Sequence, residues 1–259
     1  MEALGLDCQV SPHDFRTALA VMRCNGFQLP TGHGSVALYD RASMMAHSCC
    51  PSAAFDFNVE GHILVRALRG LAAGEEITVS YLPLLACRQS TELRRLKLED
   101  RLFVCHCERC EWHVDLSRGF CCPNSSCSGS CLMPVSAAPL NSEEEGNILE
   151  ETSATCNVCG AVLCGPQLKE VLEHEARYGF VVEYGSMAHN AATAEGLAEG
   201  AATVFRQHWI LACILQALAR HCAAQGDAAR HAVCLDHSAQ LWQAMLAPWP
   251  WLVRAWAVV

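Results

Sequence analysis

The stretch Arg41-Ala-Ser-Met-Met-Ala-His-Ser-Cys-Cys-Pro-Ser-Ala-Ala-Phe-Asp56 decides how this chain is organised. Its first half is apolar and would suit a buried segment. The run His47-Ser-Cys-Cys-Pro51 then concentrates groups that bind metals, accept protons or turn the chain. An ordinary hydrophobic core does not need such groups, so the stretch indicates a functional site.

Two later stretches complement this one. Gly74-Glu-Glu-Ile-Thr-Val-Ser-Tyr81 is a turn followed by an alternating strand that ends in a phenol. The segment Cys105-His-Cys-Glu-Arg-Cys110 is dense in thiols. In this order and spacing, from about Cys24 to Cys110 and more loosely to the C-terminus, the chain resembles the SMYD type of SET-domain protein lysine methyltransferases. In that type a SET domain is joined to a MYND zinc finger.

Composition and charge limit the class of protein. A chain of 259 residues with 52% apolar and 17% charged residues is long enough for one large or two medium globular domains. The net charge of -9 argues against nucleic-acid binding, which needs clustered Lys and Arg, and favours basic peptide partners. Eighteen cysteines without a signal-like start predict a reducing compartment, cytoplasm or nucleus, where thiolates bind metal.

The N-terminal third predicts a helix followed by short strands. Residues 11–24 have a capping Ser11 and apolar residues on one face, and Asn25-Gly26 ends the helix. Turn residues within 27–39 predict a hairpin or loop, and Glu60-Gly61 predicts a second hairpin between the strands that flank it.

Residues 84–103 are predicted to form one amphipathic helix, on which Arg94-Arg95 is interpreted as part of a solvated face. The rest of the chain predicts a turn-rich cysteine region, an acidic loop and several helical segments. These are the acidic loop 133–155, a short helix over 165–178, a connector over 185–200, and helical patterns over 201–223 and 227–246 that form an αα-hairpin. The apolar tail 246–259 is too short to span a bilayer and is expected to pack on the protein or to end irregularly.

The expected fold class is α+β. It combines a partial SET-domain β-fold, a post-SET zinc site, a zinc-ribbon-like insert and an α-helical C-terminal hairpin region similar to the tetratricopeptide-like hairpins of the family. Three domains are predicted: residues 1–104 as the C-terminal part of the SET domain with a preceding helix, 105–165 as the post-SET and zinc-binding region, and 166–259 as the helical region.

Two zinc sites are predicted, because zinc prefers four soft ligands in a tetrahedron and short Cys spacings supply several at once. Cys105, Cys107 and Cys110 provide three ligands, and the resemblance implies Cys49 as the fourth. The paired knuckles Cys122/Cys127 and Cys156/Cys159 read as a zinc ribbon, with Cys121, Cys131 and Cys164 as competing ligands.

The resemblance also implies a methyl-transfer site. Transfer to a lysine amine needs a neutral nucleophile in a dry channel, which aromatic walls and a phenol provide. By resemblance Tyr81 orients the amine, Phe27 walls the channel and Tyr39 is a further wall. The S-adenosylmethionine contacts carried over by position are Asn25, Ser43, Met45, Ala46, His47 and Phe103.

Three departures from the family pattern bear on activity. Ala46 replaces an asparagine that could hydrogen-bond the cofactor, and Ser52 replaces an asparagine at a bracing turn. The chain also begins after the place where the family has its first SET strands, their cofactor loop and the MYND finger.

The leading hypothesis is therefore a zinc-stabilised, S-adenosylmethionine-dependent protein-lysine N-methyltransferase. Its substrate would be a lysine of a histone or another protein. The main alternative is a catalytically impaired SET/zinc adaptor that binds protein partners, which Ala46 and the family segments absent before residue 1 favour. A zinc-dependent nucleic-acid binder suits the cysteines but not the charge, and no membrane partner is expected.

Overall fold

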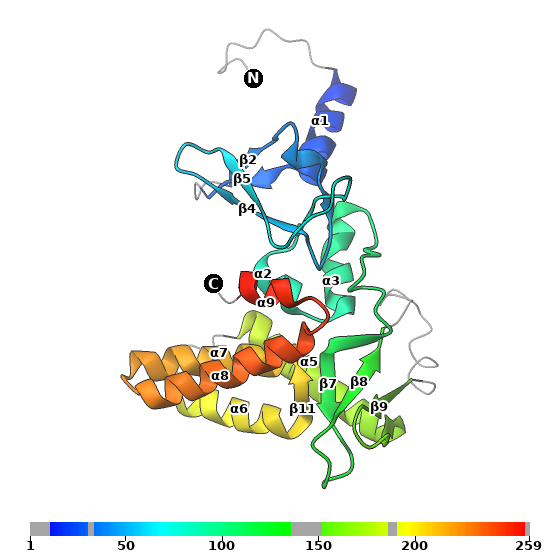
Figure 1. The fold of residues 1–259 in the computed structure, drawn as a ribbon, viewed down its shortest axis with the longest axis vertical. Helices are drawn as coiled ribbons and strands as arrows, with labels where there is room; N and C mark the ends of the chain where they lie inside the picture. The colour runs from blue at the N-terminus through cyan, green and yellow to red at the C-terminus, as the bar shows by residue number, and fades with distance from the viewer. Residues whose placement is uncertain (1–10, 31–33, 136–151, 186–190, 257–259) are drawn as a thin grey trace.

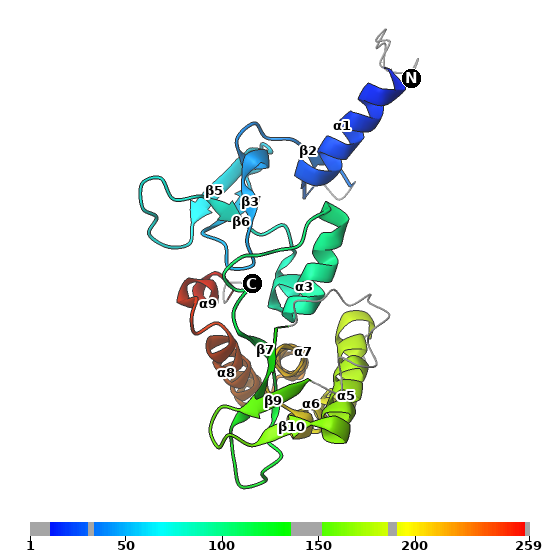
Figure 2. The same ribbon diagram turned by 90° about the vertical axis from the view of Figure 1, so that its right-hand side faces the viewer.

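The computed structural model describes residues 11–30, 34–135, 152–185 and 191–256. The chain forms an elongated molecule with small β-pieces and helix α1 at one end, and a larger sheet with long helices at the other (Figure 1). Helices α2 (Leu84–Arg88), α3 (Thr91–Leu98) and α9 (Pro250–Trp256) lie between the two ends in both views (Figures 1 and 2). The fold mixes helices and strands, as the sequence predicts.

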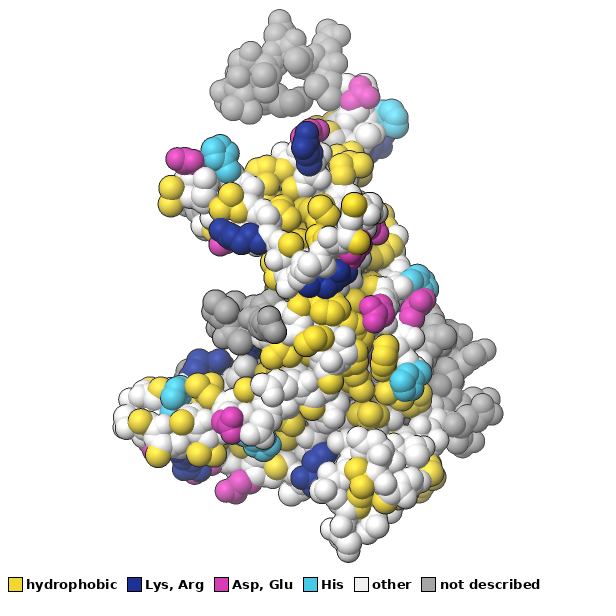
Figure 3. Space-filling view, in the orientation of Figure 1, with side chains coloured by type: hydrophobic (Ala, Val, Ile, Leu, Met, Phe, Trp, Pro, Cys, Tyr) yellow, Lys and Arg dark blue, Asp and Glu magenta, His cyan; other side chains and the backbone are white. Residues whose placement is uncertain are grey.

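Helix α1 (Pro12–Asn25) confirms the N-terminal helix. The Ser11 hydroxyl accepts a hydrogen bond from the Asp14 amide at 3.1 Å, as an N-cap does, and Gly26 follows the last turn. No residue of α1 is buried, and its apolar side chains, among them Phe15 and Leu19, are about half exposed. Hydrophobic side chains also gather across the middle of this face of the molecule (Figure 3).

Three two-stranded pieces follow. Both predicted hairpins form: β1 (Phe27–Gln28) pairs antiparallel with β2 (Val36–Ala37), and β4 (Ala53–Phe57) pairs with β5 (Ile63–Ala67). The third piece is a parallel pair of β3 (Ala46–His47) with β6 (Thr78–Val79), so the strand expected to run to Tyr81 is only two residues long. This pairing brings His47 beside the residues that lead into Tyr81.

Ser52 takes part in joining these pieces. Its hydroxyl accepts a hydrogen bond from the Thr78 amide at 2.9 Å, and its own amide donates to Thr78 Oγ1 at 3.0 Å. The side chain is 3% exposed, so these bonds are shielded from water. Serine at this turn therefore braces β6 despite being shorter than asparagine.

The prediction of a single helix over residues 84–103 is wrong. The structure divides it into α2, α3 and a 3-10 turn, η3 (Glu99–Arg101). The break falls at Gln89-Ser90, where the Ser90 hydroxyl accepts from the Leu93 amide and caps α3. The buried carboxylate of Asp115 also accepts from the Thr91 amide, so a contact distant in sequence supports the new helix start.

The interpretation of Arg94-Arg95 as a solvated pair is also wrong. Arg94 is fully buried and donates hydrogen bonds to the Gln89 carbonyl and to Thr91 Oγ1. Arg95 is half-buried and donates to the carbonyls of Cys105 and Cys110. Both guanidinium groups therefore belong to the packing around the cysteine segment, because that segment lies against α3.

The larger sheet has five antiparallel strands in the order β10-β9-β8-β7-β11. Its strands are β7 (Val114–Cys121), β8 (Ser130–Pro134), β9 (Ser153–Cys156), β10 (Val162–Cys164) and β11 (Phe205–His208). The middle of the predicted acidic loop, residues 136–151, lies outside the described residues. Strand β11 comes from the C-terminal region and completes the sheet of the cysteine-rich region, so the two predicted domains share it; the domain boundaries stay a proposal.

Four longer helices make up most of the rest of the chain. They are α5 (Gly165–Tyr184), α6 (Ala191–Val204), α7 (Trp209–Ala224) and α8 (Ala228–Met245). Helices α7 and α8 confirm the αα-hairpin, with Gly226 at φ +78° in its turn, a region that favours glycine. Helix α5 is longer than predicted.

Two predictions in this region are wrong. Residues 191–200 form part of α6 rather than a connector, because its alanines have high helix propensity. The predicted helix over 201–223 is interrupted by β11, in which Phe205 and His208 are buried against the sheet. Pairing with β7 thus overrides the local helical pattern.

The apolar tail packs on the protein through α9. Trp249 and Leu252 are buried in one hydrophobic cluster with Cys49, Cys105 and Cys110. The indole of Trp251 donates to the Pro51 carbonyl at 3.1 Å. The C-terminal helix therefore covers the region where Cys49, Cys105 and Cys110 are buried.

Candidate functional site

Four thiols from two distant segments meet beneath the β3–β6 pair. The sulfurs of Cys49, Cys105, Cys107 and Cys110 all lie within 4.8 Å of one another. The Cys49 sulfur is 4.0 Å from that of Cys105 and 3.6 Å from that of Cys110. A zinc ion with four Zn–S bonds of about 2.3 Å keeps its sulfurs about 3.8 Å apart. The group therefore has the donor set and spacing of a structural zinc site, and these four residues could hold the ion.

Two buried guanidinium groups face this cysteine group. Arg94 Nη2 lies 3.6 Å from Cys110 Sγ, and Arg109 donates to the carbonyls of Cys49 and Cys87. Burial acts to lower the pKa of Arg94, but the neighbouring Cys49 and Cys110 outweigh it and raise the pKa overall. Buried positive charge suits four thiolates around one zinc ion, because their negative charge is larger than the positive charge of the ion.

His47 links the cysteine group to Tyr81. Its Nδ1 accepts a hydrogen bond from the Tyr81 amide at 2.9 Å, so Nε2 carries the proton and faces Cys49 Sγ at 3.3 Å. Burial lowers the pKa of His47 to about 4, which keeps the ring neutral. Both ring nitrogens are thereby used within the protein.

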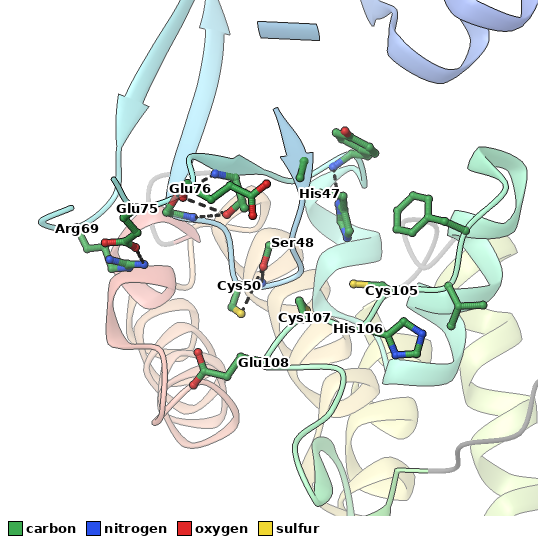
Figure 4. A pocket seen from close by; sticks show the side chains of 16 residues that line it. His47, Ser48, Cys50, Arg69, Glu75, Glu76, Cys105, His106, Cys107 and Glu108 are labelled. Carbon is green, nitrogen blue, oxygen red and sulfur yellow. Dashed lines mark hydrogen bonds and ion pairs between the residues drawn. The ribbon is translucent and has the colours of Figure 1, made fainter. Parts of the chain in front are cut away.

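A groove of about 690 Å³ opens beside this cysteine group. Of the predicted site residues it is lined by Ala46, His47, Tyr81, Phe103, Cys105 and Cys107. Figure 4 shows the Arg69–Glu75 ion pair at one end of the groove and His106 at the other, with Glu108 projecting from the loop of the cysteine segment. The half-buried ring of Phe103 stands 5.9 Å from the His47 ring and 6.3 Å from that of Tyr81.

A second cavity, of about 290 Å³, is also lined by Tyr81. It is lined by Asn25, Phe27, Ser43 and Tyr81 among the predicted residues, and also by Phe55 and Arg101. The rings of Phe27 and Phe55 meet edge to face with centroids 4.8 Å apart. This cavity thus has aromatic walls and a phenol, the features expected of a channel that strips water from an ammonium group.

Tyr81 lines both cavities. Its hydroxyl donates to the Met45 carbonyl at 2.5 Å, which leaves the lone pairs of the phenol oxygen available as acceptors. Burial raises the pKa of Tyr81, although Arg101, which lies over the ring at 5.5 Å, acts in the opposite direction. The phenol therefore stays protonated near neutral pH.

Three other predicted residues are engaged in hydrogen bonds within the protein. Tyr39 does not line either cavity; its hydroxyl donates to the Gly61 carbonyl, and its ring lies behind Phe27 at 5.8 Å. The side-chain amide of Asn25 donates to the Val21 carbonyl, and the Ser43 hydroxyl accepts from the backbone amide of Tyr39. Asn25 and Ser43 also lie in the smaller cavity, so the predicted cofactor contacts are divided between the two cavities.

Sequence reasoning missed Phe55, Arg94 and Arg101. The alternation of Phe55 and Phe57 in a hairpin strand could have indicated a half-buried aromatic face for Phe55. No local signal marks the two arginines, because their partners, Cys110 for Arg94 and Tyr81 for Arg101, lie elsewhere in the sequence.

The second cysteine group lies in the larger sheet. The sulfurs of Cys122, Cys127, Cys156 and Cys159 are within 4.8 Å of one another, with 3.5 Å between those of Cys122 and Cys159. Among the competing cysteines, Cys121 instead donates to the Ala202 carbonyl. This group is also of a kind that could hold zinc, and Cys159 leaves it more exposed than the first.

No helix in the described parts of the chain combines the length and the apolar character needed to cross a bilayer.

Comparison with known proteins finds a SET domain in the N-terminal third of the chain. Residues 13–82 match the family model of the SET domain. Mouse histone-lysine N-methyltransferase SMYD3 is 38% identical over 102 residues, which cover 38% of this chain and 23% of that protein. Human N-lysine methyltransferase SMYD2 is 34% identical over 96 residues, which cover 35% of this chain and 21% of that protein.

Mouse histone-lysine N-methyltransferase Smyd1 is 33% identical over 107 residues, which cover 35% of this chain and 21% of that protein. The chain therefore spans less than a quarter of the length of these relatives. Residues 13–82 carry a SET domain, and the homologues over part of the chain are SMYD-type protein lysine methyltransferases.

Proposed function

We propose that this chain is part of a protein-lysine N-methyltransferase that uses S-adenosylmethionine. The observation that carries the proposal is that Tyr81 lines both an open groove with Phe103 and a smaller cavity with aromatic walls. The groove, of about 690 Å³, has the size of a small-molecule site. The smaller cavity suits the narrow side chain of a lysine.

The residues that line the two cavities would have separate roles in methyl transfer. S-adenosylmethionine supplies the methyl group on a sulfonium. Phe103 would present its ring to the adenine, and Ala46 and His47 line the same groove. On the other side, Phe27 and Phe55 would exclude water from the lysine amine, which lowers the pKa of the ammonium and favours the neutral nucleophile.

Tyr81 would align the amine with the methyl group. Because its proton is donated to the Met45 carbonyl, the phenol oxygen can accept a hydrogen bond from the incoming amine. The two cysteine groups would each hold a zinc ion. The ion at the first group would hold His47 and the backbone of Tyr81 in place, because His47 contacts the Cys49 sulfur and accepts a hydrogen bond from the Tyr81 amide.

The protein substrate, histone or not, is also part of the proposal, because the relatives' names refer to histone lysine in some cases and to lysine in others. The net charge of -9 favours a substrate with basic residues near the target lysine. The reduced thiols and this substrate class suit cytoplasm or nucleus.

Tritiated S-adenosylmethionine, incubated with zinc-loaded chain and a mixture of histones and lysine-containing peptides, tests this function. The expected result is zinc-dependent transfer of label that Tyr81→Phe lowers at least tenfold, because the amine loses its acceptor. Absence of transfer by the wild-type chain under all these conditions would contradict the proposal for this chain.

The adaptor remains the second candidate, because Ala46 lacks the amide that the family uses towards the cofactor. The variant Ala46→Asn distinguishes the enzyme from the adaptor in the same assay. Transfer that rises with Ala46→Asn supports a weakened enzyme, whereas no transfer by either form, with peptide binding retained, supports an adaptor.

A further inference from the structure

A groove of about 530 Å³, which shares no lining residue with the two cavities at Tyr81, lies where α2, α7, α8 and α9 meet. Its floor is apolar: Trp242 is 6% exposed and Leu246 is fully buried. Leu235, on α8, lines the same groove and is 42% exposed. Leu84 and Val253 are half-buried and also line the groove, so apolar side chains from three helices are open to a ligand.

Two arginines add positive charge to this apolar groove. Arg88 is 8% exposed, donates to Gln216 Oε1 at 3.1 Å and lies over the Trp242 ring at 4.9 Å. Arg220, on α7, is exposed and makes no hydrogen bond or ion pair with another described residue. No acidic residue is among those that line the groove in the described structure.

The local charge runs against that of the whole chain. The net charge of -9 repels anions at long range. Exposed Arg220, with no acid among the described residues that line the groove, reverses this locally, and next to low-dielectric apolar walls a guanidinium attracts an anion more strongly than it does in open water. The combination favours a ligand that has both an apolar body and one negative charge.

We propose that this groove binds an amphipathic carboxylate, such as a single-chain fatty acid. The alkyl chain would lie on Leu84, Leu235 and Val253 above the edge of Trp242, and the carboxylate would pair with Arg220 at the mouth, beside Arg88. The volume is in the range of small-molecule sites. This site is separate from the cavities around Tyr81, so the proposal does not depend on methyl transfer.

Calorimetric titration of sodium laurate, below its micelle concentration, into the zinc-loaded chain tests the proposal. The expected result is saturable binding of one laurate per chain. Dodecyltrimethylammonium, with the same chain length and the opposite charge, should bind at least tenfold more weakly. Arg220→Gln should weaken laurate binding about tenfold, because a charge-assisted hydrogen bond is lost.

Two variants separate the groove from general surface effects. Ala239→Phe places a ring in the groove from an exposed helix position and should abolish laurate binding while the thermal unfolding curve stays unchanged. Arg177→Gln removes an exposed arginine of α5 outside the groove and should leave binding unaltered. Equal binding of laurate and the cationic detergent, or laurate binding that survives Ala239→Phe, would overturn the proposal. The proposal would also be overturned if the chain forms dimers without laurate and Ala239→Phe converts them to monomers. A second copy of the chain would then occupy the groove.

Discussion

The guanidinium of Arg94 lies 3.6 Å from the sulfur of Cys110, and Arg94 is fully buried. A positive charge with no exposure is costly unless a negative partner balances it. Four thiolates and one zinc ion carry a net negative charge, so Arg94 fits the zinc-bound form of the first cysteine group.

Replacing Arg94 is therefore expected to weaken zinc binding at that group. Arg94→Leu should speed zinc release from it at least tenfold and lower the free energy of unfolding by about 3–5 kcal/mol, as for a broken buried ion pair. A coloured chelator that reports released zinc measures the rate. Arg16→Leu, at an exposed position of α1, is the control. Unchanged release from Arg94→Leu would contradict the role of this arginine.

Zinc content should be two ions per chain, one for each cysteine group. Cys110→Ser and Cys159→Ser should each remove one ion and leave the other in place, which mass spectrometry under native conditions resolves. The ion at the second group should be lost first to EDTA, because Cys159 is exposed whereas Cys49, Cys105 and Cys110 are buried. Loss of both ions in either single variant would show that the groups do not bind independently.

Glu175 should make stability depend on pH. Burial acts to raise its pKa, but Arg118, 2.9 Å away, and His208 outweigh burial and hold the pKa at about 2. A carboxyl whose folded pKa is lowered from 4.5 to about 2 stabilises the fold above pH 4.5, and this stability is lost as the pH falls towards 2. The contribution is about 3 kcal/mol.

Urea unfolding at pH 6.5 and pH 3.5 measures this dependence. Because zinc release also depends on pH, the informative quantity is the difference between Glu175→Gln and wild type, which should shrink as the pH falls. Glu170→Gln, at an exposed position of the same helix, should follow the wild-type profile. A constant difference between Glu175→Gln and wild type would argue against the ion pair as its cause.

Trp249 should contribute strongly to stability. It is 1% exposed, meets the Trp112 ring edge to face at 5.5 Å, and lies 6.0 Å from the guanidinium of Arg109. Trp249→Ala would leave a large cavity beside the first cysteine group and lower the free energy of unfolding by about 3–5 kcal/mol. Val233→Ala, at a position 68% exposed, should change it by no more than about 0.5 kcal/mol. A small effect of Trp249→Ala in chemical denaturation would show that the turn leading into α9 is not part of the stable core.

Local sequence signals predicted the elements that local chemistry determines. Ser11 caps α1, the turn at Glu60-Gly61 forms a hairpin, and Gly226 turns α7 into α8, because each depends on residues close in sequence. The grouping of Cys49 with Cys105, Cys107 and Cys110 came from family resemblance, since the spacing alone leaves the fourth ligand open.

The errors arose where distant contacts decide the structure. Strand β11 interrupts a helical pattern because its backbone pairs with β7, more than eighty residues earlier. Arg94 has the helical spacing of a surface residue, yet it is buried because the cysteine segment packs on its side of α3. Neither the partner strand nor the thiol group can be seen in a window of ten or twenty residues.

Calorimetric titration of S-adenosylmethionine into the zinc-loaded chain tests the central proposal most directly. The proposed site predicts one saturable site per chain, competition by S-adenosylhomocysteine, and at least tenfold weaker binding after Phe103→Ala. A flat titration for folded chain with both zinc ions in place would contradict the proposal that the groove beside Tyr81 holds this cofactor.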